Sequence, residues 1–86
     1  MKISVELTLT PLADDYEPPI ISLIKGLRDS GLKILETPLS TQVFGDYERV
    51  MEVLIKEIKP ALEESGKALL YMKIVTTDRS DYAPHF

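Results

Sequence analysis

The order of the periodic segments is the feature of this sequence that most constrains its fold. Residues 2–10 alternate between apolar and polar side chains, which is typical of a β-strand with one covered face. Residues 18–30 and 47–65 instead carry apolar side chains at the spacing of amphipathic helices. Short β-type segments lie at residues 32–37, 41–44 and 68–75. The sequence therefore predicts the order β-α-β-β-α-β.

Proline and acidic residues mark where the two helices are expected to begin. Pro18 and Pro19 fit the first turn of a helix, where a missing amide donor costs little. Asp14 and Asp15 precede them and offer acceptors for the free amides at the helix start. Asp46 stands in the corresponding place before the second helix, so we expect it to act as a cap.

Composition narrows the class of protein. The chain has 86 residues, 44% of them hydrophobic, which suits one folded domain. It contains no cysteine, so disulfides, thiolate metal sites and a cysteine nucleophile are excluded. The net charge of −4 and the lack of a basic stripe argue against nucleic acid as a partner. No apolar run reaches the roughly 20 residues of a membrane span. We expect a cytoplasmic protein that binds neither nucleic acid nor membranes.

The predicted element order is typical of a ferredoxin-like fold, an α+β two-layer sandwich. Right-handed crossovers place both helices on one face of a four-stranded antiparallel sheet, with the expected strand order 4-1-3-2. The last strand, residues 68–75, is almost continuously apolar, which predicts cover on much of both faces. We assign residues 1–77 to this single domain. Residues 78–86 form a C-terminal tail, expected to be a flexible end or an arm across a partner.

The sheet face away from the helices is expected to mix polar and apolar groups. Glu6, Thr8 and Thr10 alternate with the apolar residues of the first strand. Phe44 from the third strand and Tyr71 from the fourth are expected beside them. We do not expect a face of this kind to remain fully exposed to solvent. A second subunit, a ligand or both would cover it. A homodimer or a dimer of dimers would cover it symmetrically.

The stretch from Thr37 to Tyr47 surrounds a short apolar run with hydroxyls, a proline and a glycine. Residues 38–40 are expected to form the turn of a hairpin. Ser40 and Thr41 then lie at a strand start, where polar side chains need hydrogen-bond partners. A small polar ligand is one such partner, and closure of the turn itself is the alternative.

Two segments match a known pattern in order and spacing. Leu9-Thr10-Pro11-Leu12 is followed by Asp14-Asp15-Tyr16, and the Ser-Thr pair within Leu39–Asp46 is followed shortly by Gly-Asp. From about Ser4 to Thr77 the chain resembles the YkoF-type thiamin/hydroxymethylpyrimidine-binding domains and the related small single-domain thiamine-binding proteins. The resemblance implies a ferredoxin-like fold, oligomers built through the sheet, and non-catalytic binding of thiamine or its pyrimidine moiety. The chain departs from the pattern at Thr10, where an aromatic residue is frequent, and at Phe44, where many single-domain members carry an acidic residue.

The residue chemistry can be compared with such a ligand. Thiamine has an aminopyrimidine edge, which a carboxylate such as Glu6 can accept from, and a positively charged thiazolium. Glu6 could instead pair with Lys73 on the neighbouring strand. The threonines could line a pocket or serve only as strand formers, and the aromatic residues could stack on a ring or pack between subunits. The candidate ligand-binding residues are Glu6, Thr8, Thr10, Ser40, Thr41, Phe44 and Tyr71.

Enzymatic chemistry finds little support in the sequence. The single histidine, His85, is next to the end of the tail, a poor place for a preorganised base. No Ser-His-Asp arrangement, phosphate-binding glycine loop or metal-ligand motif is present. We therefore predict no catalytic residue, no metal and no cofactor apart from a thiamine-type ligand. The alternative is a ligand-free oligomeric module for regulation or interaction.

Overall fold

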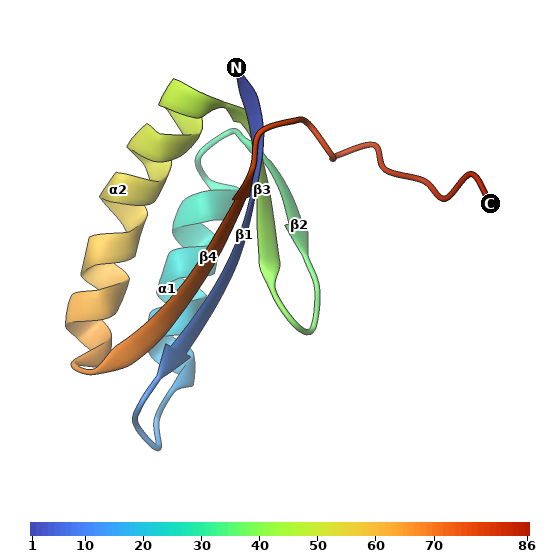
Figure 1. The fold of residues 1–86 in the computed structure, drawn as a ribbon. Coiled ribbons are helices and arrows are strands. Elements are labelled where there is room, and N and C mark those ends of the chain that lie inside the picture. Colours follow the sequence, from blue (N-terminus) through green and yellow to red (C-terminus); the bar gives the residue numbers. More distant parts are fainter.

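The computed structural model describes residues 1–86 and contains the predicted succession of strands and helices (Figure 1). The elements are β1 (Lys2–Pro11), α1 (Glu17–Arg28), β2 (Lys33–Glu36), β3 (Thr41–Asp46), α2 (Tyr47–Ser65) and β4 (Ala68–Val75). The four strands form one sheet in the order β2-β3-β1-β4, and every neighbouring pair is antiparallel. The predicted ferredoxin-like sandwich and its strand order 4-1-3-2 are confirmed.

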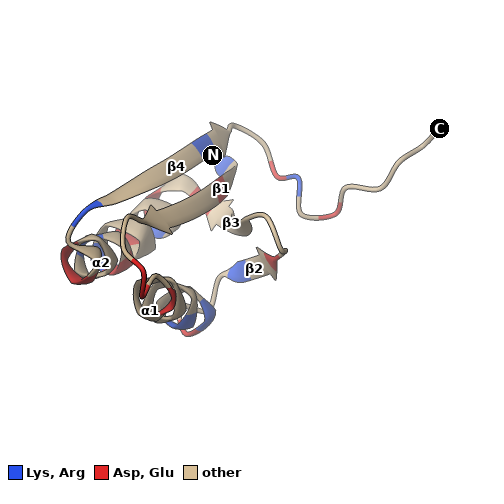
Figure 2. Cartoon of the chain, turned by 90° about the horizontal axis from the view of Figure 1, so that it is seen from below, with Lys and Arg blue, Asp and Glu red and all other residues tan.

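The hydrophobic core lies between the sheet and the helices, which share one side of the sheet (Figure 2). Ile3, Val5 and Leu7 of β1 are at most 2% exposed and lie in one cluster with Leu27 of α1 and Leu54 of α2. The alternation in β1 therefore reports the buried face correctly, because successive side chains of a strand point to opposite sides. Neither helix is long and apolar enough to cross a membrane.

The helix starts differ in detail from the expectation. Tyr16, rather than Asp14 or Asp15, is the residue at the N-terminus of α1, and it makes no side-chain capping bond. Asp46 does precede α2, but its carboxylate lies 3.2 Å from Lys2 Nζ and does not cap the helix. The predicted capping bonds are therefore wrong. At α2 the chain itself supplies an acceptor, because the Tyr47 amide donates to the carbonyl of residue 1 at 2.9 Å.

Strand β4 forms one edge of the sheet, and most of its residues are exposed in the single chain, although Ala68 and Leu70 pack against the core. Tyr71 is 65% exposed on the side away from the helices, and Met72 is 45% exposed on the side that faces α2. The apolar sequence of β4 predicts that both of its faces are covered. The single chain does not provide this cover. An apolar edge strand of this kind is suited to contact another surface.

The first part of the C-terminal segment lies on its own sheet. Ser4, on the side of β1 away from the helices, donates through Oγ to the Thr77 carbonyl at 2.8 Å and accepts from the Arg79 amide at 2.9 Å. Lys33 of β2 donates through Nζ to the Ser80 carbonyl at 3.3 Å. The segment therefore passes from the β4 edge over β1, is reached by the Lys33 side chain, and then projects away from the sheet (Figure 1). The predicted flexible end or arm across a partner thus begins as a segment bound to its own chain.

Candidate functional site

The side of the sheet away from the helices, here called the outer face, carries most of the candidate residues. Its β1 residues are Ser4, Glu6, Thr8 and Thr10, which alternate with the core residues. The register places Glu6 between Gln42 of β3 and Lys73 of β4. It also places Thr8 opposite Tyr71. The central strand thus brings a carboxylate, an amide and an ammonium group into one row across the sheet.

Glu6 is the centre of this polar row. Its Oε2 accepts a hydrogen bond from Ser40 Oγ at 2.9 Å, and its Oε1 lies 3.7 Å from Lys73 Nζ. The Glu6 side chain stays 41% exposed, so the carboxylate is held on two sides and still open to a ligand. A hollow of about 180 Å³, here called the Glu6 cavity, lies beside it. It is lined by Ser4, Val5, Glu6, Gln42, Lys73 and Val75.

The turn between β2 and β3 places Ser40. The Thr37 hydroxyl accepts from the amides of Leu39 and Ser40, at 3.3 and 3.1 Å, and donates to the Ser40 carbonyl at 3.0 Å. The Thr37 amide donates to the same carbonyl at 2.9 Å. Thr8 of β1 ties the turn to the sheet by donating from Oγ1 to the Leu39 carbonyl at 3.3 Å. With its backbone fixed in this way, Ser40 directs its hydroxyl to Glu6.

A second hollow, here called the hairpin cavity, lies between this turn and α1. It measures about 170 Å³ and combines apolar side chains with hydroxyls. Thr8, Ser40 and Thr41 all line it, together with Ile20 and Ile24 of α1. Because Ser40 lines this cavity and also bonds Glu6, the Ser40–Glu6 hydrogen bond forms the boundary between the two cavities.

The structure brings four of the predicted site residues together and keeps three apart from them. Glu6 lines the first cavity, whereas Thr8, Ser40 and Thr41 line the second. The remaining three, Thr10, Phe44 and Tyr71, line neither cavity. Phe44 is on the outer face, opposite Ser4, but it is only 5% exposed. Tyr71 and Thr10 are exposed on the open part of the outer face.

Sequence reasoning did not assign three residues that line the Glu6 cavity as ligand contacts. Ser4 shares the alternation of Glu6 but is not among the predicted site residues, and Lys73 is predicted only as an alternative partner for Glu6. Gln42 was not considered, although it alternates with Phe44 and therefore belongs on the same face. Pairing β1 with β3 would have revealed it, since Gln42 lies directly opposite Glu6.

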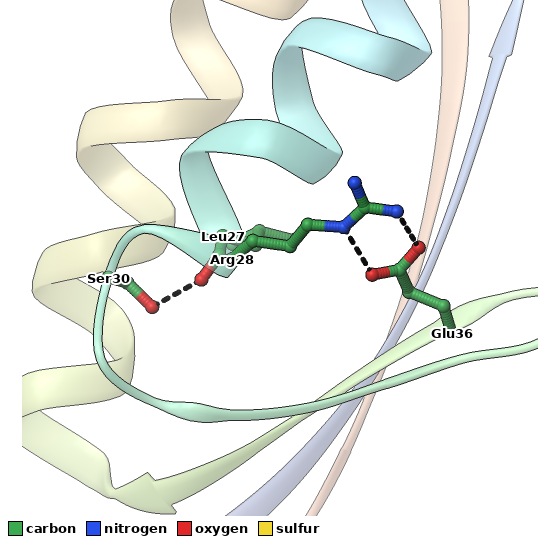
Figure 3. A network of polar contacts seen from close by, with 4 residues as sticks. All are labelled: Leu27, Arg28, Ser30 and Glu36. Atoms are coloured by element: carbon green, nitrogen blue, oxygen red, sulfur yellow. Dashed lines mark hydrogen bonds and ion pairs between the residues drawn. The ribbon is translucent and has the colours of Figure 1, made fainter.

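An ion pair fixes the β2–β3 hairpin against α1. Arg28, at the end of α1, donates from Nε and from its terminal amino group to both carboxylate oxygens of Glu36, each at 2.6 Å (Figure 3). These hydrogen bonds and the guanidinium charge lower the pKa of the Glu36 carboxyl, and Glu36 in turn raises the pKa of Arg28. Two parallel bonds define an orientation as well as a distance. They help to hold the strand that leads into Thr37 and Ser40.

The site offers binding groups but no metal-binding cluster. No group of three or more His, Asp or Glu residues is placed to hold a metal ion. The available groups are a carboxylate acceptor, hydroxyls that donate or accept, an amide with both functions and an ammonium donor. This set is suited to a small polar ring that carries several donors and acceptors along its edge.

Comparison with solved structures shows how widely this fold is shared. A protein from Streptococcus pneumoniae is 25% identical, with a TM-score of 0.83 over 91% of this chain and 89% of its own. A protein from Thermotoga maritima, provisionally described as acting in thiamine biosynthesis or salvage, is 20% identical, with a TM-score of 0.80 over 90% and 85%. A Bacillus cereus domain of unknown function is 14% identical, with a TM-score of 0.75 over 96% and 83%. The last two likenesses bear on the fold alone.

Comparison of the sequence gives a more specific result. A search of curated proteins finds no significant match. The model of the family described as thiamine-binding protein matches residues 5–86, which include the C-terminal segment and every residue that lines the two cavities except Ser4. That match agrees with the resemblance carried by the segments around Thr10 and Ser40. The chain belongs to the thiamine-binding protein family.

Proposed function

We propose that this protein binds thiamine, or its hydroxymethylpyrimidine moiety, without chemical conversion, at the Glu6 cavity and the adjoining hairpin cavity. The observation that carries the proposal is the Glu6 carboxylate, held by Ser40 and Lys73 yet 41% exposed beside an open hollow. Membership of the thiamine-binding protein family supports the same class of ligand. Binding in the cytoplasm as a carrier, buffer or sensor is the role we assign.

The polar groups divide naturally between the two rings of thiamine. The aminopyrimidine edge donates and accepts in turn, so its amino group fits the Glu6 carboxylate, while Gln42 can serve a ring nitrogen. The thiazolium carries a positive charge and is repelled by the Lys73 ammonium. We therefore place the thiazolium away from Lys73, in the hairpin cavity, where Thr8 and Thr41 supply hydroxyls.

The size of the hollows argues for a cover over the outer face. Ligand pockets usually measure about 300–1,000 Å³ and enclose most of the ligand. The Glu6 cavity, at about 180 Å³, is smaller and open to solvent. A second copy of the chain packed on the outer face would add the missing wall, with Thr10 and Tyr71 in the contact. We propose a homodimer, or a dimer of dimers, as the binding form.

Isothermal titration calorimetry tests the ligand, and native mass spectrometry tests the assembly. The purified chain is titrated with thiamine and, separately, with hydroxymethylpyrimidine. We expect heat of binding with thiamine, and one thiamine per chain in a dimer or tetramer by mass. No heat at millimolar thiamine would refute the ligand. A monomer that binds thiamine would refute only the covering subunit.

A ligand-free interaction module is the second candidate. The observation that favours it is the apolar area of the outer face, where Leu35, Leu69 and Tyr71 are each 48% or more exposed. Surfaces of this kind are found in oligomer interfaces. A stable dimer that binds neither thiamine nor hydroxymethylpyrimidine would favour this function over the first.

A further inference from the structure

The C-terminal segment of residues 77–80, here called the clasp, is bonded on both sides of an aromatic residue that a ligand could use. Phe44 belongs to the outer face, which no helix covers, yet it is 5% exposed. It lies opposite Ser4 on one side and opposite Lys33 on the other. The clasp is hydrogen-bonded to Ser4 and to Lys33 and so passes over the position between them. A clasp in this position would account for the burial of Phe44.

The fastening of the clasp is specific. Ser4 is a buried polar residue, 8% exposed, and its hydroxyl uses both its donor and an acceptor function on the clasp backbone. Within the clasp, the Asp78 carboxylate accepts from the Ser80 amide at 2.9 Å. Bonds from Ser80, together with the charges of Lys33 and Lys2, lower the pKa of Asp78. The clasp is therefore a defined turn held at two points.

The clasp also borders the Glu6 cavity. Two residues that line this cavity mark the boundary, because Val75 ends β4 just before the clasp and Ser4 holds it. Release of the clasp would extend the cavity along the outer face to Phe44. An uncovered phenyl ring offers a flat surface on which a heterocycle stacks. With the clasp closed, Phe44 has no such surface to offer.

We propose that the clasp is a movable cover whose opening, controlled by Ser4, exposes Phe44 as a stacking surface for the ligand ring bound at Glu6. The inference rests on the proposed function for the ligand, whereas the closed clasp is a feature of the free chain. Ser4 acts as a positioning residue. Because opening costs free energy, only a fraction of the chains is open at any time. The apparent affinity for the ligand equals the affinity of the open form multiplied by that fraction. The clasp also favours ligands whose stacking on Phe44 contributes enough free energy to keep the clasp open.

Two probes test this proposal on the full chain. The chain has two phenylalanines, Phe44 and the 95% exposed Phe86, so fluorophenylalanine labelling gives one buried and one exposed ¹⁹F signal. Hydrogen exchange of the Arg79 amide reports on its bond to Ser4. We compare the wild type with Ser4→Ala. Ser65→Ala is the matched control, because its hydroxyl bonds the Ala61 carbonyl within α2, outside both cavities and the clasp.

We expect Ser4→Ala to speed exchange at Arg79 about tenfold, the worth of the hydrogen bonds it removes. The Phe44 signal should move toward a solvent-exposed value, while Phe86 and the Ser65→Ala control stay unchanged. Thiamine should speed Arg79 exchange in the wild type, and it should bind Ser4→Ala up to about tenfold more tightly. Lys33→Met, which removes the second fastening, should act in the same direction with a smaller effect.

Each negative outcome refutes one part of the proposal. If neither Ser4→Ala nor Lys33→Met changes the Phe44 signal or Arg79 exchange, the clasp is not the cover, whatever thiamine does. If thiamine binds the wild type by calorimetry but leaves the Phe44 signal and Arg79 exchange unchanged, coupling between clasp and ligand is refuted. If no variant binds thiamine, the proposed function fails, and the ligand-free ¹⁹F and exchange comparison alone decides whether the clasp opens.

Discussion

Replacement of Glu6 by glutamine separates ligand recognition from folding. The amide keeps an oxygen that can accept from Ser40, so the 2.9 Å bond survives in neutral form. The contact with Lys73 is lost, but at 3.7 Å between side chains that are 71% and 41% exposed it is worth only ~0–1 kcal/mol. We therefore expect Glu6→Gln to lower the free energy of unfolding by less than about 1 kcal/mol.

The effect on thiamine binding should be larger. A hydrogen bond to a charged group contributes ~1.5–3 kcal/mol and a neutral one ~0.5–1.5 kcal/mol. Replacement of the carboxylate acceptor by an amide acceptor should therefore cost about 1 kcal/mol of binding free energy at this half-exposed site. That difference corresponds to a dissociation constant raised roughly five- to tenfold. Calorimetry measures the affinity and urea denaturation the stability. Glu52→Gln on α2, which removes the same charge from the 2.9 Å pair with Arg49 but lies outside both cavities, is the matched control.

Two results would refute this reasoning. Wild-type affinity in Glu6→Gln would mean that the carboxylate does not accept from the ligand, and the site would have to lie elsewhere. A loss of more than about 3 kcal/mol in stability would mean that Glu6 is a buried structural ion. In that event reduced binding would report unfolding and not recognition.

Three further predictions concern stability and ligand choice. Leu54→Ala, at a core position 1% exposed, should lower the free energy of unfolding by ~2–5 kcal/mol in urea denaturation. The lowered pKa of Glu36 gives stability that is present above its ordinary pKa of 4.5 and is lost as pH falls through the lower folded value. Arg28→Met should therefore flatten the decline in melting temperature between pH 5 and more acidic buffer. Lys73→Met should change calorimetric binding of thiamine and of neutral hydroxymethylpyrimidine by similar factors, because the thiazolium is placed in the hairpin cavity, away from this ammonium. A gain confined to thiamine would put the thiazolium beside Lys73 and refute its placement.

The architecture was predictable because its signals are local and agree with one another. The alternation in β1 fixes which residues join Leu27 and Leu54 in the core, and the helical spacing elsewhere identifies the covering layer. Strand order then follows from connection rules. The prediction of capping at Asp46 was wrong because nearby Lys2 attracts the carboxylate, a contact between the chain start and the middle of the sequence.

The position of the C-terminal segment had no local signal. Its fastening depends on Ser4, more than 70 residues earlier in the chain, and on a lysine of the far edge strand. A serine within a strand and a polar tail are each unremarkable in sequence. Only the assembled sheet shows that the serine hydroxyl is buried and that a backbone amide and carbonyl from the tail satisfy it. The proposed cover of Phe44 depends on the same contact.

The register of β3 gives the adjacent hydroxyls of Ser40 and Thr41 different tasks. Thr41 lies opposite Leu7 and so belongs to the helix side of the sheet, whereas Ser40 reaches Glu6 on the outer face. Because a strand turns successive side chains to opposite sides, one ring cannot contact both Glu6 on the outer face and Thr41 on the helix side. A ligand that uses the Glu6 carboxylate and the Thr41 hydroxyl must therefore extend around the Ser40–Glu6 bond. Thiamine has two linked rings and meets this requirement, whereas hydroxymethylpyrimidine fills one cavity. Simultaneous use of Glu6 and Thr41 would thus favour thiamine over its pyrimidine moiety.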